Sequence, residues 1–158
     1  MRKLISAVLF VAATTACPLA AAQDTAAAMA DLQAMQQAAR KDKRALVNEK
    51  LQLTPAEAKN FWPVYDNLQR ELTRLNRERN VALETLANRD RPPSDAYAKQ
   101  IVNDLMTTEE QEIKALRKAA NASMKALPPR KAARYLQLEN KLRAVQDYEI
   151  AVAFPLVQ

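Results

Sequence analysis

The 158-residue sequence contains no glycine. Without glycine it cannot form a phosphate-binding loop, a dinucleotide-binding fingerprint, a nucleophile elbow or an EF-hand, all of which need glycine at fixed positions. The sequence also lacks histidine and has one cysteine, Cys17, so the usual zinc and iron ligands and the partners of Ser-His or Cys-His catalysis are missing. These absences exclude most enzyme classes and favour a binding protein without metal or cofactor.

Prolines divide the rest of the chain into four segments rich in Ala, Leu, Lys, Arg, Glu and Gln, which are good helix formers. We expect helices over residues 25–50, 55–87, 95–126 and 129–154. Thr54 should cap the second helix, with Pro55 at its first position and Glu57 completing a capping box. Pro63 falls inside that helix and should bend it.

The N-terminus has the pattern of a secretory signal. Two basic residues precede an uncharged, mostly apolar run over residues 4–16, and Ala20 and Ala22 stand at −3 and −1 before Gln23. The run is too short to span a membrane. We therefore expect residues 1–22 to be removed, leaving one exported helical domain over residues 23–158; the family resemblance described below implies that it stays in the periplasm.

An alternative is a lipoprotein anchor at Cys17, but Thr14 stands where such signals usually carry leucine. Removal of the signal takes away two basic residues and no acidic ones, so the net charge falls from +6 to +4 (6 − 2). That charge is modest for a nucleic-acid module, and export places the chain away from nucleic acid. No second long apolar segment follows, so stable membrane insertion is not expected.

Apolar residues recur at alternating intervals of four and three in the two middle segments, as on the packed face of a long helix. In the second segment the predicted core stripe is Phe61, Tyr65, Leu68, Leu72, Leu75, Arg79, Ala82 and Leu86. In the third it is Val102, Met106, Glu109, Ile113, Leu116, Ala120, Met124 and Leu127. Arg79 and Glu109 interrupt these stripes, either because they pair with each other or because those positions face water.

A shift of 74 residues aligns the second segment with the fourth without a gap. It places Leu53 on Leu127, Pro55 on Pro129, Ala58 on Ala132, Phe61 on Tyr135 and Leu68 on Leu142. The repeated unit is a helix, a tight proline-containing joint and a second helix. The sequence therefore predicts an all-α, elongated four-helix fold made of two repeated antiparallel helical hairpins, which must pack on each other or on a second copy.

The two joints resemble the L-T-x-x-Q motif of the Spy/CpxP family of periplasmic stress proteins. They read Leu53-Thr54-Pro55-Ala56-Glu57 and Leu127-Pro128-Pro129-Arg130-Lys131, so Glu57 and Lys131 replace the family's glutamine. Residues 61–66 and 134–139 are similar to an uncharacterised branch of that family. The resemblance implies a homodimer shaped as a curved cradle and an ATP-independent chaperone for unfolded envelope proteins. Its CpxP side implies instead a regulatory partner, the periplasmic domain of a stress-sensing kinase.

Binding of unfolded chains needs positive charge for capture and small apolar patches for weak contact on one surface. The candidate protein-binding residues are Arg70, Arg74 and Arg77, Arg40 and Arg44, and Trp62. A further basic group is Lys114, Arg117 and Lys118. The alternative for each group is a solvated helix face balanced by nearby glutamates.

The aromatic cluster of the second segment has two expected roles. Phe61 and Tyr65 fit the core stripe, whereas Trp62 lies about 100° away on the helix and is the candidate for a partner contact. Glu109, Glu110 and Glu112 are interpreted as a solvated face, because no histidine accompanies them as a metal ligand. The predicted function is thus ATP-independent binding of unfolded or partner envelope proteins; the alternatives are a regulatory binder of one envelope signalling protein and a structural or assembly protein.

Overall fold

The structure is a computed structural model that describes residues 19–88 and 90–156, with side chains from residue 25 onward. It contains the helices α1 (Leu19–Leu51), α2 (Pro55–Ala87), α3 (Asp95–Ala126) and α4 (Pro129–Ala153), and no strand among the described residues. The all-α prediction and its four helices are confirmed. The basic and apolar parts of the predicted signal, with Cys17, lie outside the described residues. None of the described helices is long and apolar enough to cross a membrane.

The helix boundaries follow local chemistry. The Thr54 hydroxyl accepts a hydrogen bond from the Glu57 amide, and the Glu57 carboxylate accepts one from the Thr54 amide, which confirms the predicted capping box. Pro55 begins α2, and the helix continues through Pro63. Ser94 caps α3, whereas α4 follows Pro128 without a side-chain cap.

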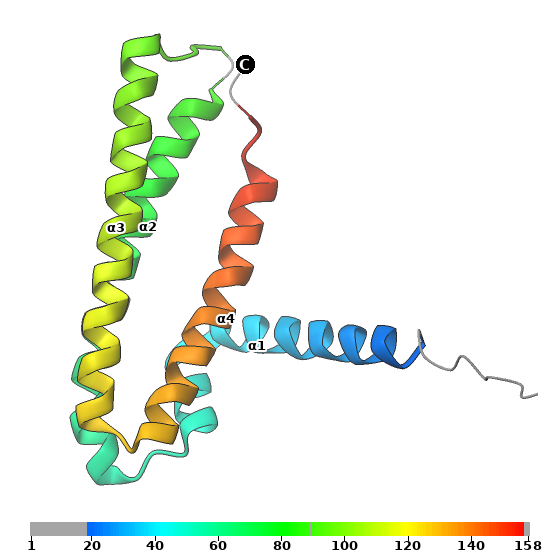
Figure 1. The fold of residues 1–158 in the computed structure, drawn as a ribbon, viewed down its shortest axis with the longest axis vertical. Coiled ribbons are helices and arrows are strands. Elements are labelled where there is room, and N and C mark those ends of the chain that lie inside the picture. Colours follow the sequence, from blue (N-terminus) through cyan, green and yellow to red (C-terminus); the bar gives the residue numbers. More distant parts are fainter. Residues whose placement is uncertain (1–18, 89, 157–158) are drawn as a thin grey trace, which may run out of the picture.

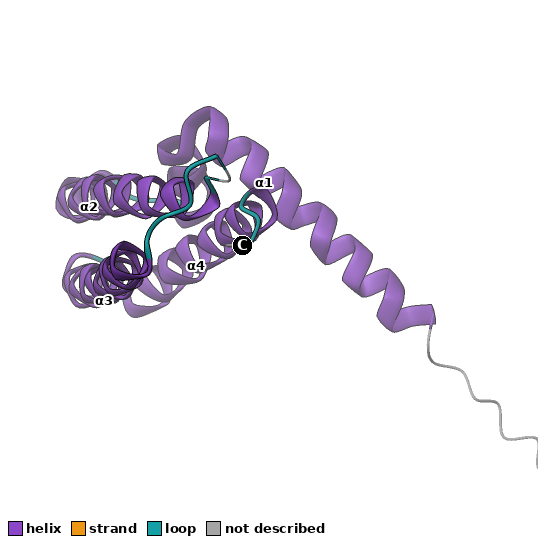
Figure 2. Cartoon of the chain, turned by 90° about the horizontal axis from the view of Figure 1, so that it is seen from above, coloured by secondary structure: helices purple, strands orange, loops and turns teal. Residues whose placement is uncertain are grey.

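The helices form a tall, narrow body with a lateral arm (Figure 1). α2 and α3 make a long antiparallel hairpin, and α1 contacts α4. We call the end that holds the connections 51–55 and 127–129 the joint end, and the end that holds the connection 88–94 the loop end. α4 lies against the hairpin near the joint end and separates from it toward the loop end (Figures 1 and 2). The main helix contacts are thus between α2 and α3 and between α1 and α4, with a smaller one between α3 and α4, so the predicted pairing of each hairpin within itself, α1 with α2 and α3 with α4, is not the dominant packing.

α1 changes direction at Asp42, which has an extended backbone (φ −156°, ψ 92°) between two helical stretches. The Asp42 carboxylate accepts a hydrogen bond from the Ala45 amide at 2.9 Å, so it caps the second stretch. The first stretch then projects away from the body as an arm (Figure 2). The helix therefore changes direction without glycine or proline, and the Asp42 carboxylate caps the new stretch.

The core lies at the joint end. Its fully buried members include Val47, Phe61, Ala132 and Tyr135. The rings of Phe61 and Tyr135, which the 74-residue repeat aligns, pack edge to face with centroids 4.8 Å apart. Burial, aided by the negative charge of Glu139, raises the pKa of the neighbouring Tyr65 to about 12, so this ring packs as a neutral group. The predicted core role of Phe61 and Tyr65 is confirmed.

The two residues that depart from the family motif contact each other. The Lys131 ammonium donates to the Glu57 carboxylate at 2.7 Å and to the Gln52 carbonyl oxygen at 2.7 Å. The hydrogen bond from Lys131 is the largest cause that lowers the pKa of Glu57. The two joints are therefore connected by an ion pair between equivalent positions of the repeat.

The predicted core stripe of α3 is confirmed at Leu127 and Leu116, which belong to or pack against the core, but it is wrong for its other large apolar residues. Val102, Met106, Ile113 and Met124 are about half exposed. The residues of α3 that are buried instead are Ile101, Thr108, Glu112, Ala119 and Ser123. Small and polar side chains face the body here because the facing leucines of α2 fill the interface and because Glu112 has cationic partners.

The predicted pairing of Arg79 with Glu109 is also wrong. Arg79, whose side chain is 15% exposed, pairs with Asp147 at 2.9 Å and approaches Glu112 at 3.9 Å. Glu112 in turn accepts a hydrogen bond from Arg143 at 2.5 Å. These four residues connect α2, α3 and α4 at mid-height, whereas Glu109 is exposed and thus fits the other reading, that its position faces water.

Candidate functional site

The first candidate surface is the apolar row that α3 leaves in solvent. We call Val102, Met106, Ile113 and Met124 the α3 stripe. The spacing of four, seven and eleven residues places them along one side of the helix. No packing inside the described part of the chain explains why this side is apolar. The pattern that predicted a core therefore leaves four large apolar side chains in contact with solvent.

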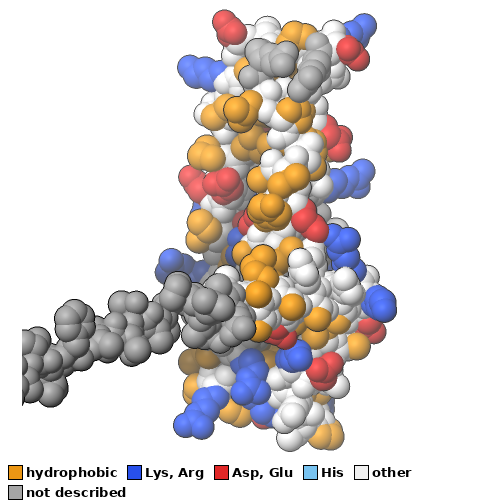
Figure 3. Space-filling model, turned by 90° about the vertical axis from the view of Figure 1, so that its right-hand side faces the viewer, with side chains coloured by type: hydrophobic (Ala, Val, Ile, Leu, Met, Phe, Trp, Pro, Cys, Tyr) orange, Lys and Arg blue, Asp and Glu red, His pale blue; other side chains and the backbone are white. Residues whose placement is uncertain are grey.

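A hollow of about 400 Å³ adjoins this stripe. It lies where α4 separates from the hairpin, and Ile113, Ile150 and Ala151 supply its apolar wall. Arg79, Glu112, Arg143 and Asp147 close its inner end with the ion pairs described above. Figure 3, which looks onto the side where α4 lies, shows hydrophobic side chains gathered along the upper half of this face. The apolar surface thus extends from α3 across the opening to α4.

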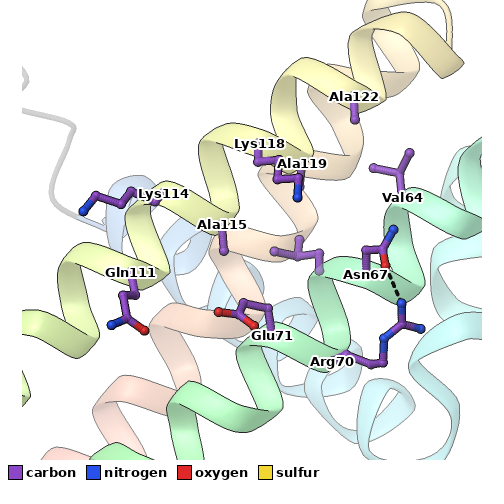
Figure 4. A pocket seen from close by; sticks show the side chains of 11 residues that line it. Val64, Asn67, Arg70, Glu71, Gln111, Lys114, Ala115, Lys118, Ala119 and Ala122 are labelled. Atoms are coloured by element: carbon purple, nitrogen blue, oxygen red, sulfur yellow. Dashed lines mark hydrogen bonds between the residues drawn. The ribbon is translucent and has the colours of Figure 1, made fainter.

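The second candidate surface is a groove between α2 and α3. Its largest hollow has a volume of about 680 Å³ and an apolar floor formed by Val64, Leu68 and the alanines 115, 119 and 122. Arg70 and Glu71 line it from α2, and Gln111, Lys114 and Lys118 line it from α3 (Figure 4). A further hollow continues it between the same two helices toward the loop end, and another adjoins it on α3 alone. The predicted basic row of α2 and the basic group of α3 are thereby brought to one groove.

The arginines of the predicted row differ in their partners. Arg74 donates to both Glu71 and Glu78, and these hydrogen bonds raise the pKa of Arg74 and lower that of Glu71. Its charge is therefore balanced within the helix, as the solvated-face alternative expects. Arg70 contacts only the Asn67 side-chain amide, and Arg77 has no ion pair within the described residues. Arg70 and Arg77 remain available to an anionic partner.

The other predicted binding residues lie away from this groove. Arg40 pairs with Glu149, and Arg44 pairs with Asp66 at 2.7 Å. The Arg44 guanidinium stacks on the Trp62 ring at 4.1 Å from its centroid. Trp62 is half-buried and also contacts the Phe61 and Tyr65 rings. Arg44 and Trp62 thus lie where α1 contacts α2, Arg40 lies where α1 contacts α4, and Arg70, Arg74 and Arg77 lie on the hairpin.

A buried polar cluster holds α1 to α2 and α4. Glu139, which is 1% exposed, accepts hydrogen bonds from Lys43 and Gln69, both at 2.8 Å. This cluster positions the helices, and its Lys43 and Gln69 also line a hollow of about 220 Å³ that extends to Arg79 and Glu112. Among the described residues, no group of three or more Asp, Glu or Cys side chains is placed to hold a metal ion.

Sequence reasoning missed three contributors to these surfaces. Lys125 extends the basic group of α3 by two turns, and Val81 and Tyr97 line the groove near the loop end. The spacing of Lys114, Lys118 and Lys125 at intervals of four and seven would have revealed Lys125. Nothing in the sequence indicated that Val81 and Tyr97, on different helices, meet at one hollow.

Comparison with protein-family models, with curated proteins and with solved structures finds no match to this chain. The resemblance to the Spy/CpxP family therefore remains a prediction from the joint motifs.

Proposed function

We propose that this chain binds apolar segments of incompletely folded envelope proteins, without a nucleotide, and so keeps them from aggregating. The observation that carries the proposal is the α3 stripe, an apolar row exposed along a helix whose other side is packed. Exposed apolar rows of this kind mark sites of protein contact. The glycine-free sequence has no phosphate-binding loop, so the binding is passive.

The composition of the stripe fits many weak partners. Two of its four members are methionine, an unbranched and polarizable side chain that adapts to partners of different shape. Four half-exposed side chains also fall well short of the about 800 Å² per partner that a stable protein interface buries. Both features favour brief contact with many chains over a permanent partner.

Charge next to the stripe supports the same function. Lys114 and Lys125 directly follow Ile113 and Met124, so they point about 100° away from them on the helix. A captured chain can therefore contact apolar and cationic side chains of α3 together. The cations supply long-range attraction, and salt should weaken it.

The test is the aggregation of several chemically denatured proteins, followed by light scattering with equimolar chain and no nucleotide. The variant Met106→Ser/Ile113→Ser/Met124→Ser should lose most of the suppression. Its matched control, Asn103→Ser/Thr107→Ser/Asn121→Ser, changes exposed polar positions of the same helix and should behave as the wild type. Because all these side chains are exposed, stability should change by less than about 0.5 kcal/mol.

Three results would contradict the proposal. Full suppression by the stripe variant would remove the α3 stripe from the function. Unchanged aggregation with the wild-type chain would remove the function itself. Capture of one stoichiometric envelope protein would favour the regulatory alternative, and a stable dimer that buries the stripe would favour the structural one.

A further inference from the structure

The groove between α2 and α3 carries cations that the fold does not use. Within the described residues, Arg77, Arg117, Lys118 and Lys125 form no ion pair, and Arg70 contacts only a neutral amide. Lys114 approaches Glu110 only at 3.9 Å, and both side chains are largely exposed. We call these six residues the basic face.

Several cations outside this groove are used internally. Arg44, Lys131 and Arg143 form ion pairs of 2.5–2.7 Å with Asp66, Glu57 and Glu112. Positive charge left unpaired on one side of a protein raises the local electrostatic potential and attracts an anionic partner. The basic face is therefore a surface on which six cations without a tight ion pair lie together.

The basic face is broad and lies on the hairpin alone. The three hollows that its residues line contain no residue of α1 or α4. Arg70 and Arg77 lie on α2, and the other four lie on α3, which runs antiparallel beside it (Figures 1 and 4). Alanine side chains form much of the floor between the two rows. Two straight rows of cations on adjacent helices match a planar distribution of negative charge.

The loop end of the same groove adds interfacial side chains. Val81 and Tyr97 are about half exposed and line one hollow together with Arg77. Tyrosine is favoured at the level of lipid headgroups, where its ring contacts apolar chains and its hydroxyl contacts water. A nucleic acid would instead be recognised by aromatic rings that stack on bases, and Tyr97 is the one aromatic ring on this groove among the described residues.

We propose that the basic face docks the chain onto a bilayer surface rich in anionic phospholipid headgroups. The hairpin lies flat on the surface, with Tyr97 and Val81 at headgroup depth, and no helix enters the bilayer. Lys114, Lys118 and Lys125 lie on a different side of α3 from the α3 stripe, so docking through these lysines leaves the stripe accessible, with Arg117 at its border. This inference does not depend on the binding of unfolded proteins.

The test is co-sedimentation with vesicles of phosphatidylcholine alone or mixed with phosphatidylglycerol, at low and high salt. The wild type should bind only the mixed vesicles, and high salt should release it. The variant Lys114→Gln/Lys118→Gln/Lys125→Gln should lower the partition coefficient about a hundredfold, since each cation near an anionic surface contributes about fivefold. A second triple variant, Lys41→Gln/Arg134→Gln/Lys141→Gln, removes the same charge from exposed positions of α1 and α4 and should bind within about threefold of the wild type.

Several outcomes would overturn the proposal. The first is that the wild type does not bind the mixed vesicles. The second is that the two triple variants lose the same amount of vesicle binding. The third is that the wild type binds duplex DNA or RNA more tightly than vesicles and that the basic-face variant abolishes this binding. Circular dichroism verifies that both variants keep their helices. The stripe variant Met106→Ser/Ile113→Ser/Met124→Ser should still bind the mixed vesicles as the wild type does, because none of its residues belongs to the basic face, so failure of lipid binding and failure of the proposed function give different results.

Discussion

The joint end and the loop end of this molecule use the same apolar residue types in opposite ways. At the joint end, α1, α2 and α4 bury their apolar side chains in one core around Phe61 and Tyr135. At the loop end, α4 has separated from the hairpin, and Tyr97, Val102 and Met106 are about half exposed. The ion pairs of Arg79 and Glu112 lie between the two regions.

The difference indicates that the two ends of the molecule have separate roles. The joint end provides the free energy that holds the four helices together, because apolar burial is the dominant favourable contribution to folding. The loop end contributes less burial and keeps apolar side chains and an open hollow on its surface. The proposed binding needs this separation of roles, because apolar side chains buried in the core cannot contact a partner.

The sharpest test of this comparison is a pair of alanine substitutions, one at each end. Phe61→Ala removes a fully buried ring from the joint end and should cost about 3–5 kcal/mol of unfolding free energy. Leu86→Ala, at a half-buried position near the loop end, should cost only about 1–2 kcal/mol. Urea unfolding followed by circular dichroism measures both losses of unfolding free energy, and equal losses would contradict these separate roles.

A smaller effect is expected at the boundary between the two ends. Arg79→Ala leaves the largely buried Glu112 with one cation fewer and should cost about 2 kcal/mol. A double-mutant cycle of Arg79 with Asp147 should show coupling, whereas the cycle with Glu109 should show none. Coupling to Glu109 instead would mean that α3 is rotated relative to the structure.

The smallest effect concerns acid stability at the joint end. The pKa of Glu57 is lowered in the folded chain, so its contribution is present above the ordinary value of 4.5 and is lost as pH falls through the lowered value. Glu57→Gln keeps a capping side chain but has no charge for Lys131. Thermal unfolding of this variant should therefore depend less on pH between neutral and acid conditions. An unchanged pH dependence would show that the joint pair is not formed in solution.

The sequence predicted α2 well and α3 poorly, for a physical reason. The buried residues of α2 are Phe61, Tyr65, Leu68, Leu72 and Leu75, all in the predicted stripe. The buried side of α3 instead carries Thr108, Glu112 and Ser123, which hydropathy assigns to the surface. Their burial depends on partners from other helices, such as Arg143, and a single segment does not contain that information.

The candidate surfaces were predictable in part. Helical spacing brought Arg70, Arg74 and Arg77 to one side of α2, and the structure places the basic group of α3 across the groove from them. The spacing did not show that Arg74 is balanced by two glutamates or that Arg44 covers Trp62. Which charges stay unpaired depends on side chains that approach from neighbouring turns and helices.

The bend at Asp42 has a practical consequence. The helical stretch over residues 25–41 extends about 25 Å from the bend at about 1.5 Å per residue, on the side of the body away from the α2–α3 groove (Figure 1). A fluorophore or surface linker attached near Thr25 would thus be held at a distance by a rigid spacer. Immobilised in this way, the chain would present its hairpin outward to vesicles and to client proteins alike.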